Sequence, residues 1–159
     1  MEQPDGTHLA QFNVATAIDD LDSDRLTGFM AAIRGVNKRA DMSPGFVWRL
    51  QDEIGAATGL SARNDPRLIV NLSVWATAED LERFVWGAMH AKVYARKAKW
   101  FAPPKAHHLV MWWVPVGHEP SLEEALARLD QLDVQGPAAD AFGRESLSNV
   151  QLWRSQRCA

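Results

Sequence analysis

Residues 67–75 form the most constrained segment of this sequence, because aliphatic side chains occupy every second position. A period of two places successive side chains on opposite faces of an extended strand. One face of this strand is purely aliphatic and the other is mixed, with Leu68, Val70, Leu72 and Val74 on the first face and Ile69, Asn71, Ser73 and Trp75 on the second. The segment therefore predicts a buried strand. The rest of the chain must supply the strands that pair with it and the elements that pack on its two faces.

Three further segments have the composition of strands, namely residues 8–15, 46–51 and 107–114. They are rich in branched and aromatic residues and are bounded by turn residues. Residues 52–66 show no sustained period and contain two glycines, an asparagine and a proline. We expect this segment to be a long loop, less ordered than the strands that it joins.

Three segments show helical periodicity. Acidic or hydroxyl side chains, which favour a helix N-terminus, precede each of them. Their apolar stripes run from Leu26 to Ile33, from Leu81 to Trp100 and from Leu122 to Leu132. Gly87 interrupts the second stripe and can loosen or kink that helix, which the sequence otherwise predicts to continue until the prolines at 103–104.

The order of elements is β, α, β, β, α, β followed by an added C-terminal helix. This order is the split βαβ arrangement of an α+β, ferredoxin-like fold with an antiparallel sheet. We expect one domain over residues 1–136 and an irregular, partly docked tail over residues 137–159. The strands are apolar on both faces, so a second copy closing on the face without helices would form a dimeric α/β barrel. A homodimer is therefore predicted.

Charge and motif content exclude several classes of function. A formal net charge of -3 provides no basic surface for nucleic acid. The first residues lack the features of a signal peptide, and no apolar run reaches the roughly 18 residues of a membrane span, so we expect a cytoplasmic protein without membrane contact. Glycine-rich phosphate loops and metal-ligand spacings such as H-E-x-x-H are missing from the sequence, and we expect no metal site.

Several amides are candidates for ligand recognition. Asn13 and Asn71 lie on strands that we expect to be neighbours, and Gln11 and Ser73 share their respective faces. Buried amides are unfavourable unless paired, so such a group indicates either a bound polar ligand or a network that satisfies itself. Asn37 lies eleven residues after Leu26 and so falls on the apolar stripe of the first helix. It either caps that helix or joins the other amides at one pocket.

His90 is the strongest candidate for acid–base chemistry, because imidazole titrates at about pH 6.5 and exchanges a proton near neutrality. The alternative is a histidine hydrogen-bonded at a packed helix surface. Tryptophan is also unusually frequent, with seven residues against a single tyrosine. Most tryptophans must pack in the core or at an interface, and some are expected to wall a pocket.

Four segments carry a resemblance to a known family: SPGFVWRL at 43–50, VNLSVW at 70–75, residues 84–101 and HLVMWWVP at 108–115. They resemble a bacterial family known only as a domain of unknown function, over about residues 8–136, with the tail outside. That family belongs to the dimeric α/β-barrel superfamily, together with antibiotic biosynthesis monooxygenases, haem-degrading monooxygenases and plant polyketide cyclases. The resemblance implies their fold and assigns no reaction.

The wider superfamily suggests where a site lies. In haem-degrading members, an asparagine on the first strand, a tryptophan ending the third and a histidine on the next helix surround the ligand. Asn13, Trp75 and His90 stand at similar places in this sequence. In the polyketide cyclases, a histidine on that helix is the catalytic base. The resemblance thus implies a pocket near His90, and we expect these three residues to converge on it.

The combined hypothesis is a cofactor-independent oxygenase, cyclase or isomerase acting on an apolar, aromatic or polyketide-like molecule. His90 would be the acid/base, and Asn13 and Asn71 would hold a developing oxyanion. Two alternatives stay open: a haem-binding or haem-degrading monooxygenase, and a non-catalytic dimeric ligand-binding protein. The residues expected to contact the substrate are Trp75, Asn71, Trp86, Trp100 and Asn37.

Overall fold

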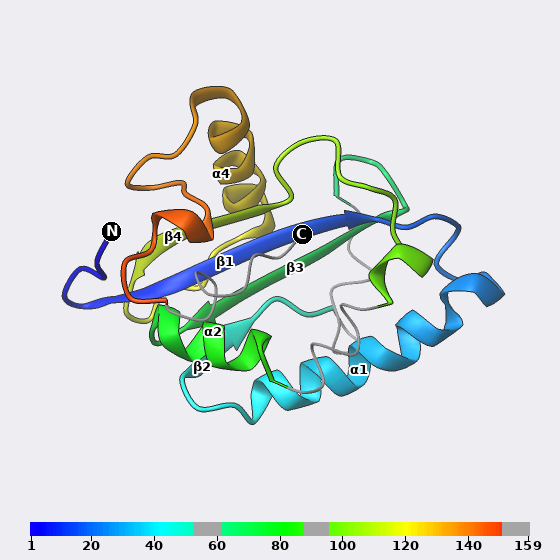
Figure 1. Cartoon of the computed structure of the whole chain (residues 1–159), viewed down its shortest axis with the longest axis horizontal. Helices are drawn as coiled ribbons and strands as arrows, with labels where there is room; N and C mark the ends of the chain where they lie inside the picture. The colour runs from blue at the N-terminus through cyan, green and yellow to red at the C-terminus, as the bar shows by residue number, and fades with distance from the viewer. Residues whose placement is uncertain (53–61, 88–95, 151–159) are drawn as a thin grey trace.

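The computed structural model describes residues 1–52, 62–87 and 96–150 (Figure 1). Four antiparallel strands form one sheet in the order β2-β3-β1-β4. This arrangement confirms the α+β, ferredoxin-like sheet that the order of elements predicts. The strands are β1 (Thr7–Thr16), β2 (Phe46–Arg49), β3 (Leu68–Trp75) and β4 (Leu109–Pro115).

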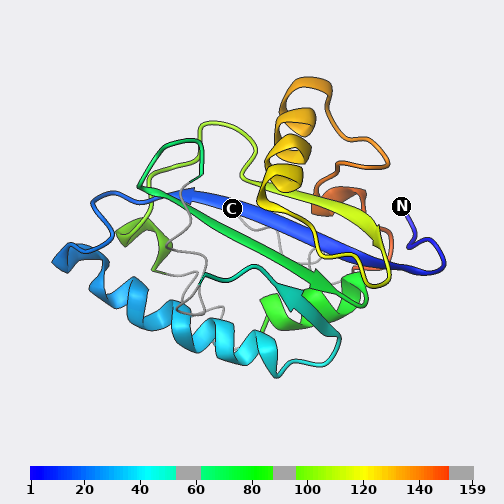
Figure 2. The same cartoon turned by 180° about the vertical axis from the view of Figure 1, so that it is seen from behind.

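Helices cover both faces of this sheet. Figures 1 and 2 show α1 and α2 on one side and α4 on the other. Within the described ranges, every helix falls short of the length and apolarity that crossing a bilayer requires. The helices are α1 (Thr27–Asp41), α2 (Ala78–Val85) and α4 (Leu122–Gln135), and the 3₁₀ turns are η1 (Asp24–Leu26), η2 (Lys97–Lys99) and η3 (Arg144–Ser146).

The helix termini follow from local capping. The Thr77 hydroxyl accepts a hydrogen bond from the Asp80 backbone N–H at 3.1 Å, and the Ser121 hydroxyl accepts one from the Glu124 N–H at 3.0 Å. These bonds satisfy donors that the first turn of a helix leaves unpaired. Gly136 ends α4 with a φ of +77°, a conformation that glycine adopts without steric cost.

Helix α2 is shorter than its periodicity predicts. It ends at Val85, with Trp86 as its C-cap, rather than continuing to Trp100. The Gly87 N–H donates to the Phe84 carbonyl at 3.1 Å, so the last turn tightens from an α to a 3₁₀ pattern. The interruption therefore lies at Gly87, where the sequence predicts a loosened or kinked helix, and α2 ends before it.

Helix α4 covers the face of the sheet to which the aliphatic side chains of β3 belong. Ala125, Leu129 and Leu132 of α4 join one buried cluster with strand residues such as Phe12 and Trp112. This face is thus buried within a single chain. The expectation that it stays bare without a second copy was wrong, because the added helix supplies the cover; a homodimer itself stays a prediction.

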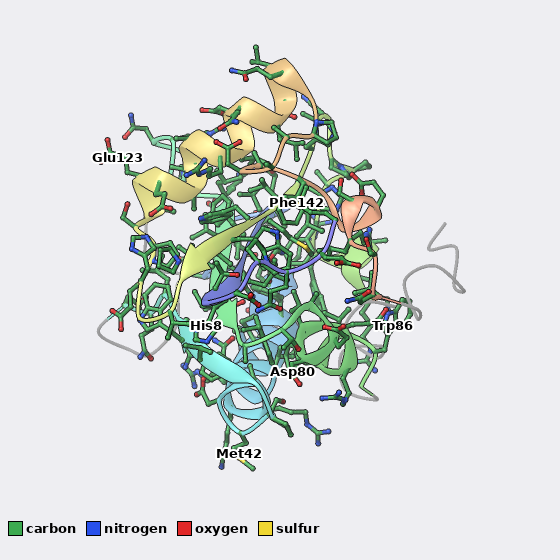
Figure 3. The ribbon with its side chains drawn as sticks, turned by 90° about the vertical axis from the view of Figure 1, so that its left-hand side faces the viewer. His8, Met42, Asp80, Trp86, Glu123 and Phe142 are labelled. Atoms are coloured by element: carbon green, nitrogen blue, oxygen red, sulfur yellow. The ribbon has the colours of Figure 1, made fainter. Side chains whose placement is uncertain are left out.

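The segment after α4 passes round the β4 edge of the sheet. Ala141 packs in the cluster on the α4 side, whereas Phe142 packs in the cluster on the opposite side. Phe142 also pairs with Met111 of β4 through two backbone hydrogen bonds of 2.7 and 2.9 Å. Figure 3 shows Phe142 inside the fold, whereas Met42 lies at its periphery.

Asp140 ties this segment to α4. Its carboxylate accepts hydrogen bonds from Gln131 at 2.8 Å and from Arg128 at 2.7 Å. The Gln131 hydrogen bond, with the Arg128 charge, lowers the pKa of Asp140 below its ordinary value. The carboxylate therefore stays ionised in this attachment at neutral pH.

Candidate functional site

The face of the sheet beneath α1 and α2 carries two separate apolar clusters. One, which we call the Trp75 cluster, surrounds that residue and includes Leu9, Leu81 and Phe142. The other, which we call the Trp100 cluster, joins Leu26 and Phe29 to the sheet at its opposite end. The two clusters therefore occupy opposite ends of this face along β1 and β3.

On β1 and β3, four polar side chains lie between the two clusters, and we call them the polar strip: Gln11, Asn13, Asn71 and Ser73. On β1 the two polar residues follow Leu9 and precede Ala17, which belong to different clusters. On β3 they lie between Ile69 and Trp75 in the same way. The sequence of each strand thus places polar groups at the centre of an otherwise apolar face.

The strand register brings these residues into pairs. Asn13 is directly opposite Asn71, and Gln11 is directly opposite Ser73. Directly opposed side chains of antiparallel strands have Cβ atoms about 4.5–5.5 Å apart, close enough to act on one ligand atom. The expectation that the two asparagines lie on neighbouring strands is confirmed.

Hydrogen bonds satisfy part of the strip. The Trp75 Nε1–H donates to Ser73 Oγ at 3.0 Å, Ser73 Oγ lies 3.3 Å from Gln11 Oε1, and Gln11 Nε2 lies 2.8 Å from Asn13 Oδ1. Gln11 and Ser73 are buried, whereas Asn13 and Asn71 are half-buried. Within the described part of the chain, the Asn71 side chain makes no hydrogen bond. The strip therefore retains amide groups that a ligand can use.

Asn37 belongs to the helix that crosses this face. It is half-buried on the inward stripe of α1, after Ile33, which packs on the Trp100 cluster, and before Ala40, which belongs to the Trp75 cluster. The capping interpretation was wrong, because α1 continues to Asp41 and ends at Met42. Asn37 thus lies on α1 between residues that pack on the two clusters.

Trp75 and Trp100 are buried anchors at the two ends of the strip. Trp75 is 1% exposed, stacked on Phe84 with ring centroids 5.0 Å apart and edge-on to Phe46 at 5.4 Å. Trp100 packs against Phe29 with ring centroids 5.8 Å apart. Both rings are enclosed by neighbouring side chains. Contact of either ring with substrate stays a prediction.

Trp86 occupies the C-cap of α2 and is half-buried (Figure 3). Its indole Nε1 is shielded from solvent and has no partner among the described residues. His90 lies outside the described residues, as does most of the loop predicted at 52–66. The convergence of His90 with Asn13 and Trp75, and the lower order of that loop, therefore stay predictions.

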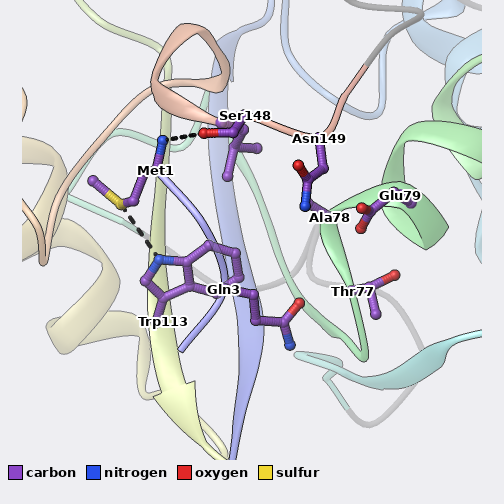
Figure 4. A pocket seen from close by; sticks show the side chains of 9 residues that line it. Met1, Gln3, Thr77, Ala78, Glu79, Trp113, Ser148 and Asn149 are labelled. Carbon is purple, nitrogen blue, oxygen red and sulfur yellow. Dashed lines mark hydrogen bonds between the residues drawn. The ribbon is translucent and has the colours of Figure 1, made fainter. Parts of the chain in front are cut away.

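A cavity of about 170 Å³ lies away from the strip, at the start of α2 (Figure 4). The Met1 amine donates to Ser148 Oγ at 2.6 Å and the Trp113 indole to Met1 Sδ at 3.4 Å across it. Ligand pockets usually measure about 300–1,000 Å³. This cavity is smaller than such pockets, and none of the predicted site residues lines it.

Two of the remaining histidines are held by carboxylates of α4. His107 Nδ1 lies 2.7 Å from Asp133 Oδ1, and His118 Nε2 lies 2.9 Å from Glu124 Oε2. In residues 1–52, 62–87 and 96–150, no group of three His, Cys, Asp or Glu side chains is placed to hold a metal ion. These histidines fasten α4 and its preceding turn to the rest of the fold.

Solved structures of similar fold share this architecture. A conserved protein from Methanosarcina mazei Go1 has a TM-score of 0.52 at 6% identity, covering 67% of this chain and 92% of its own. A protein from Shewanella oneidensis has a TM-score of 0.52 at 6% identity, covering 69% and 93%. SnoaB, a cofactor-independent oxygenase from Streptomyces nogalater, has a TM-score of 0.46 at 13% identity, covering 73% and 97%. Likeness at these identities shows the fold alone.

Sequence comparisons extend the resemblance to the tail. No curated protein matches this sequence. A family model described as "Domain of unknown function (DUF3291)" matches residues 8–158. The expectation that the resemblance stops near residue 136 was wrong, because the match includes the segment that passes round β4.

Proposed function

Because the chain belongs to the DUF3291 family, whose name implies no reaction, we propose a function from the site itself: a cofactor-independent oxygenase, cyclase or isomerase. Its substrate is a small apolar molecule of aromatic or polyketide-like character. The observation that carries the proposal is the polar strip between two apolar clusters on one face of the sheet. Such a face suits a flat apolar molecule with a polar group near its middle.

The amides of Asn13 and Asn71 provide the electrostatic part of the mechanism. They come from directly opposed positions, so both can approach one substrate oxygen. Removal of a proton next to a carbonyl places negative charge on that oxygen, and preorganised donors stabilise this charge most strongly where water is excluded. His90 is proposed as the base that removes the proton. Asn37, Trp86 and Trp100 are proposed to shape the space around the substrate.

A haem function receives no support from the described residues of this face. Haem iron requires an axial ligand, usually histidine, cysteine or tyrosine. The two clusters and the polar strip contain none of these in the described ranges. Haem binding would therefore depend on residues outside those ranges, and we derive no step through haem.

Oxygen uptake with 1,8-dihydroxyanthrone, an aromatic compound with an acidic C–H group, tests the function. We expect consumption above the spontaneous rate without added metal or cofactor. Asn13→Ala should lower the rate by about a hundredfold, as expected for the loss of an oxyanion donor. The matched control is Asn149→Ala, because Asn149 is exposed at the separate cavity.

The alternatives give different results in this assay. Saturable binding of the anthrone without turnover would indicate a non-catalytic ligand-binding protein. Turnover only after haem is added, with a haem absorption spectrum, would indicate the haem alternative. Turnover that is equal in wild type and Asn13→Ala would reject the assignment of the strip.

We also propose that the protein is a cytoplasmic homodimer that uses the β2 edge. Val47 on β2 and Met42 just before it are large apolar residues with exposed side chains, and β2 is an edge strand of the sheet. Exposed apolar edge strands favour pairing with another chain. Light scattering should give about twice the 17.7 kDa chain mass, and Val47→Lys should reduce it to the monomer mass.

Val134→Lys is the control for this experiment, because Val134 is also an exposed apolar residue but lies on α4. Its mass should match that of wild type. A wild-type monomer at micromolar concentration would reject the dimer, and a dimer that survives Val47→Lys would move the interface away from β2.

A further inference from the structure

Arg49 is a largely buried cation on the same face of the sheet as the polar strip. It lies on β2 directly opposite Ser73 of β3, and its ion-pair partner belongs to α1, which lies on that face. Directly opposed side chains of antiparallel strands have Cβ atoms about 4.5–5.5 Å apart. The strand register therefore places a positively charged side chain next to the strip, on its β2 side.

The other side of the strip is apolar. Met111 of β4 lies directly opposite Gln11, and Leu109 lies directly opposite Asn13. Met111 belongs to the Trp75 cluster and Leu109 packs against it. Across the strands, this face consequently changes from a cation on β2, through hydroxyl and amide groups on β3 and β1, to apolar side chains on β4. A bound molecule would meet a different chemistry at each end.

Asp41, the last residue of α1, is paired with this cation. Arg49 Nε lies 2.7 Å from Asp41 Oδ1, and Arg49 Nη2 lies 3.2 Å from Asp41 Oδ2. The Arg49 side chain is 13% exposed, whereas that of Asp41 is 43% exposed. Water can therefore solvate the carboxylate more readily than the cation. An ion pair that only fastens two surface elements gains little from this burial, because removing a charge from water is unfavourable.

The chemistry of the guanidinium group favours a carboxylate ligand. Its planar fork of five N–H donors matches the two oxygens of a carboxylate. Asp41 accepts from two of its nitrogens. A ligand carboxylate can share the cation with Asp41 or replace it, because the exposed Asp41 can be solvated by water instead.

We propose that Arg49 is a substrate-binding residue that recognises a carboxylate of the substrate, and that Asp41 competes with the substrate for this cation. The substrate is then an aromatic or polyketide-like acid, with its carboxylate toward β2 and its apolar body toward β4. This inference deepens the proposed function and rests on it for the face where substrate binds. The site should select such an acid over the corresponding neutral amide.

The alternative is an ion pair that only holds the end of α1 to β2. In that case, removing either charge breaks the same contact, and both variants should behave alike. If Arg49 binds the substrate and Asp41 competes for it, the two variants should act in opposite directions. Loss of the Arg49 charge should weaken binding of the acid, and loss of the Asp41 charge should strengthen it.

Equilibrium dialysis with 2-naphthoate and 2-naphthamide tests the inference, because these probes have similar shapes and differ in charge. Wild type should bind the acid about tenfold more tightly than the amide, as expected for hydrogen bonds to a charged group. Arg49→Gln should make the two affinities equal by weakening the acid alone. Asp41→Asn should increase the preference for the acid by about threefold, the scale of a partly exposed ion pair.

Arg67 and Asp20 provide the matched control, because they form an ion pair of 3.0 Å in which both side chains are more exposed. Arg67→Gln and Asp20→Asn should leave both affinities at their wild-type values. Arg49→Lys keeps the charge without the planar fork and should retain part of the preference. If Arg49→Gln does not fold, Arg49→Lys and Asp41→Asn still decide the question.

The outcomes separate this inference from the proposed function. The inference is overturned if wild type does not prefer the acid, if Arg49→Gln keeps the preference, or if Asp41→Asn fails to strengthen binding of the acid. An acid preference that depends on Arg49 supports the inference even if the anthrone is not turned over, in which case only the proposed reaction fails. Anthrone turnover without an acid preference leaves the proposed function standing and overturns this inference alone.

Discussion

Replacing His90 with alanine should reduce turnover of the anthrone by about 10²- to 10⁴-fold, the range typical for loss of a general acid or base. Substrate binding and melting temperature should change little, because the proposal assigns substrate binding to the apolar clusters and the polar strip and not to the imidazole. Oxygen uptake, ligand titration and thermal unfolding of the same preparation measure the three quantities. Loss of turnover alone identifies a catalytic group.

His107→Ala is the matched control, because the His107 imidazole is exposed and pairs with Asp133 beside α4, away from the strip. It should retain wild-type turnover. If His90→Ala instead lowers the melting temperature and leaves binding and turnover intact, then His90 is a structural residue. That result would remove the proton-transfer role and leave the ligand-binding alternative.

Replacing Trp112 with alanine should lower the free energy of unfolding by about 3–5 kcal/mol, the usual loss for a large aromatic residue in a core. Trp112 is 1% exposed and packs in the cluster that joins the sheet to α4. Its Nε1–H also donates a hydrogen bond to Glu124 Oε1 of α4 at 3.1 Å. The other oxygen of that carboxylate is hydrogen-bonded to His118 Nε2. Urea unfolding measures the change.

Trp112→Phe separates packing from hydrogen bonding, because it keeps an aromatic ring and removes the indole donor. We expect a smaller loss, part of it from the unpaired Glu124 oxygen at about 1–3 kcal/mol. The neighbouring Trp113 is half-buried and lies on the other face of the sheet. Trp113→Ala should therefore lower the free energy of unfolding by less than Trp112→Ala does. Equal losses at 112 and 113 would contradict the role of α4 as the cover of this face.

Much of this fold follows from local features of the sequence. The period of two in residues 67–75 predicts which side chains share a face, because backbone geometry alone alternates them. The opposed pair of Asn13 and Asn71 follows from this parity once the strands are neighbours. The starts of α2 and α4 were predictable for a similar reason, since a hydroxyl and a backbone N–H three residues later suffice for a cap.

The tertiary structure decided what covers each face and how the polar groups are connected. Periodicity shows that a face of the sheet is apolar, but either α4 or a second copy of the chain could bury that face. In the structure α4 buries it through packing between residues far apart in the sequence. Asn37 became an inward residue because α1 continues to Asp41. The side chains of Ser73 and Gln11 meet because β1 and β3 are neighbours in this register. Such contacts across the sheet are not encoded by any local pattern of residues.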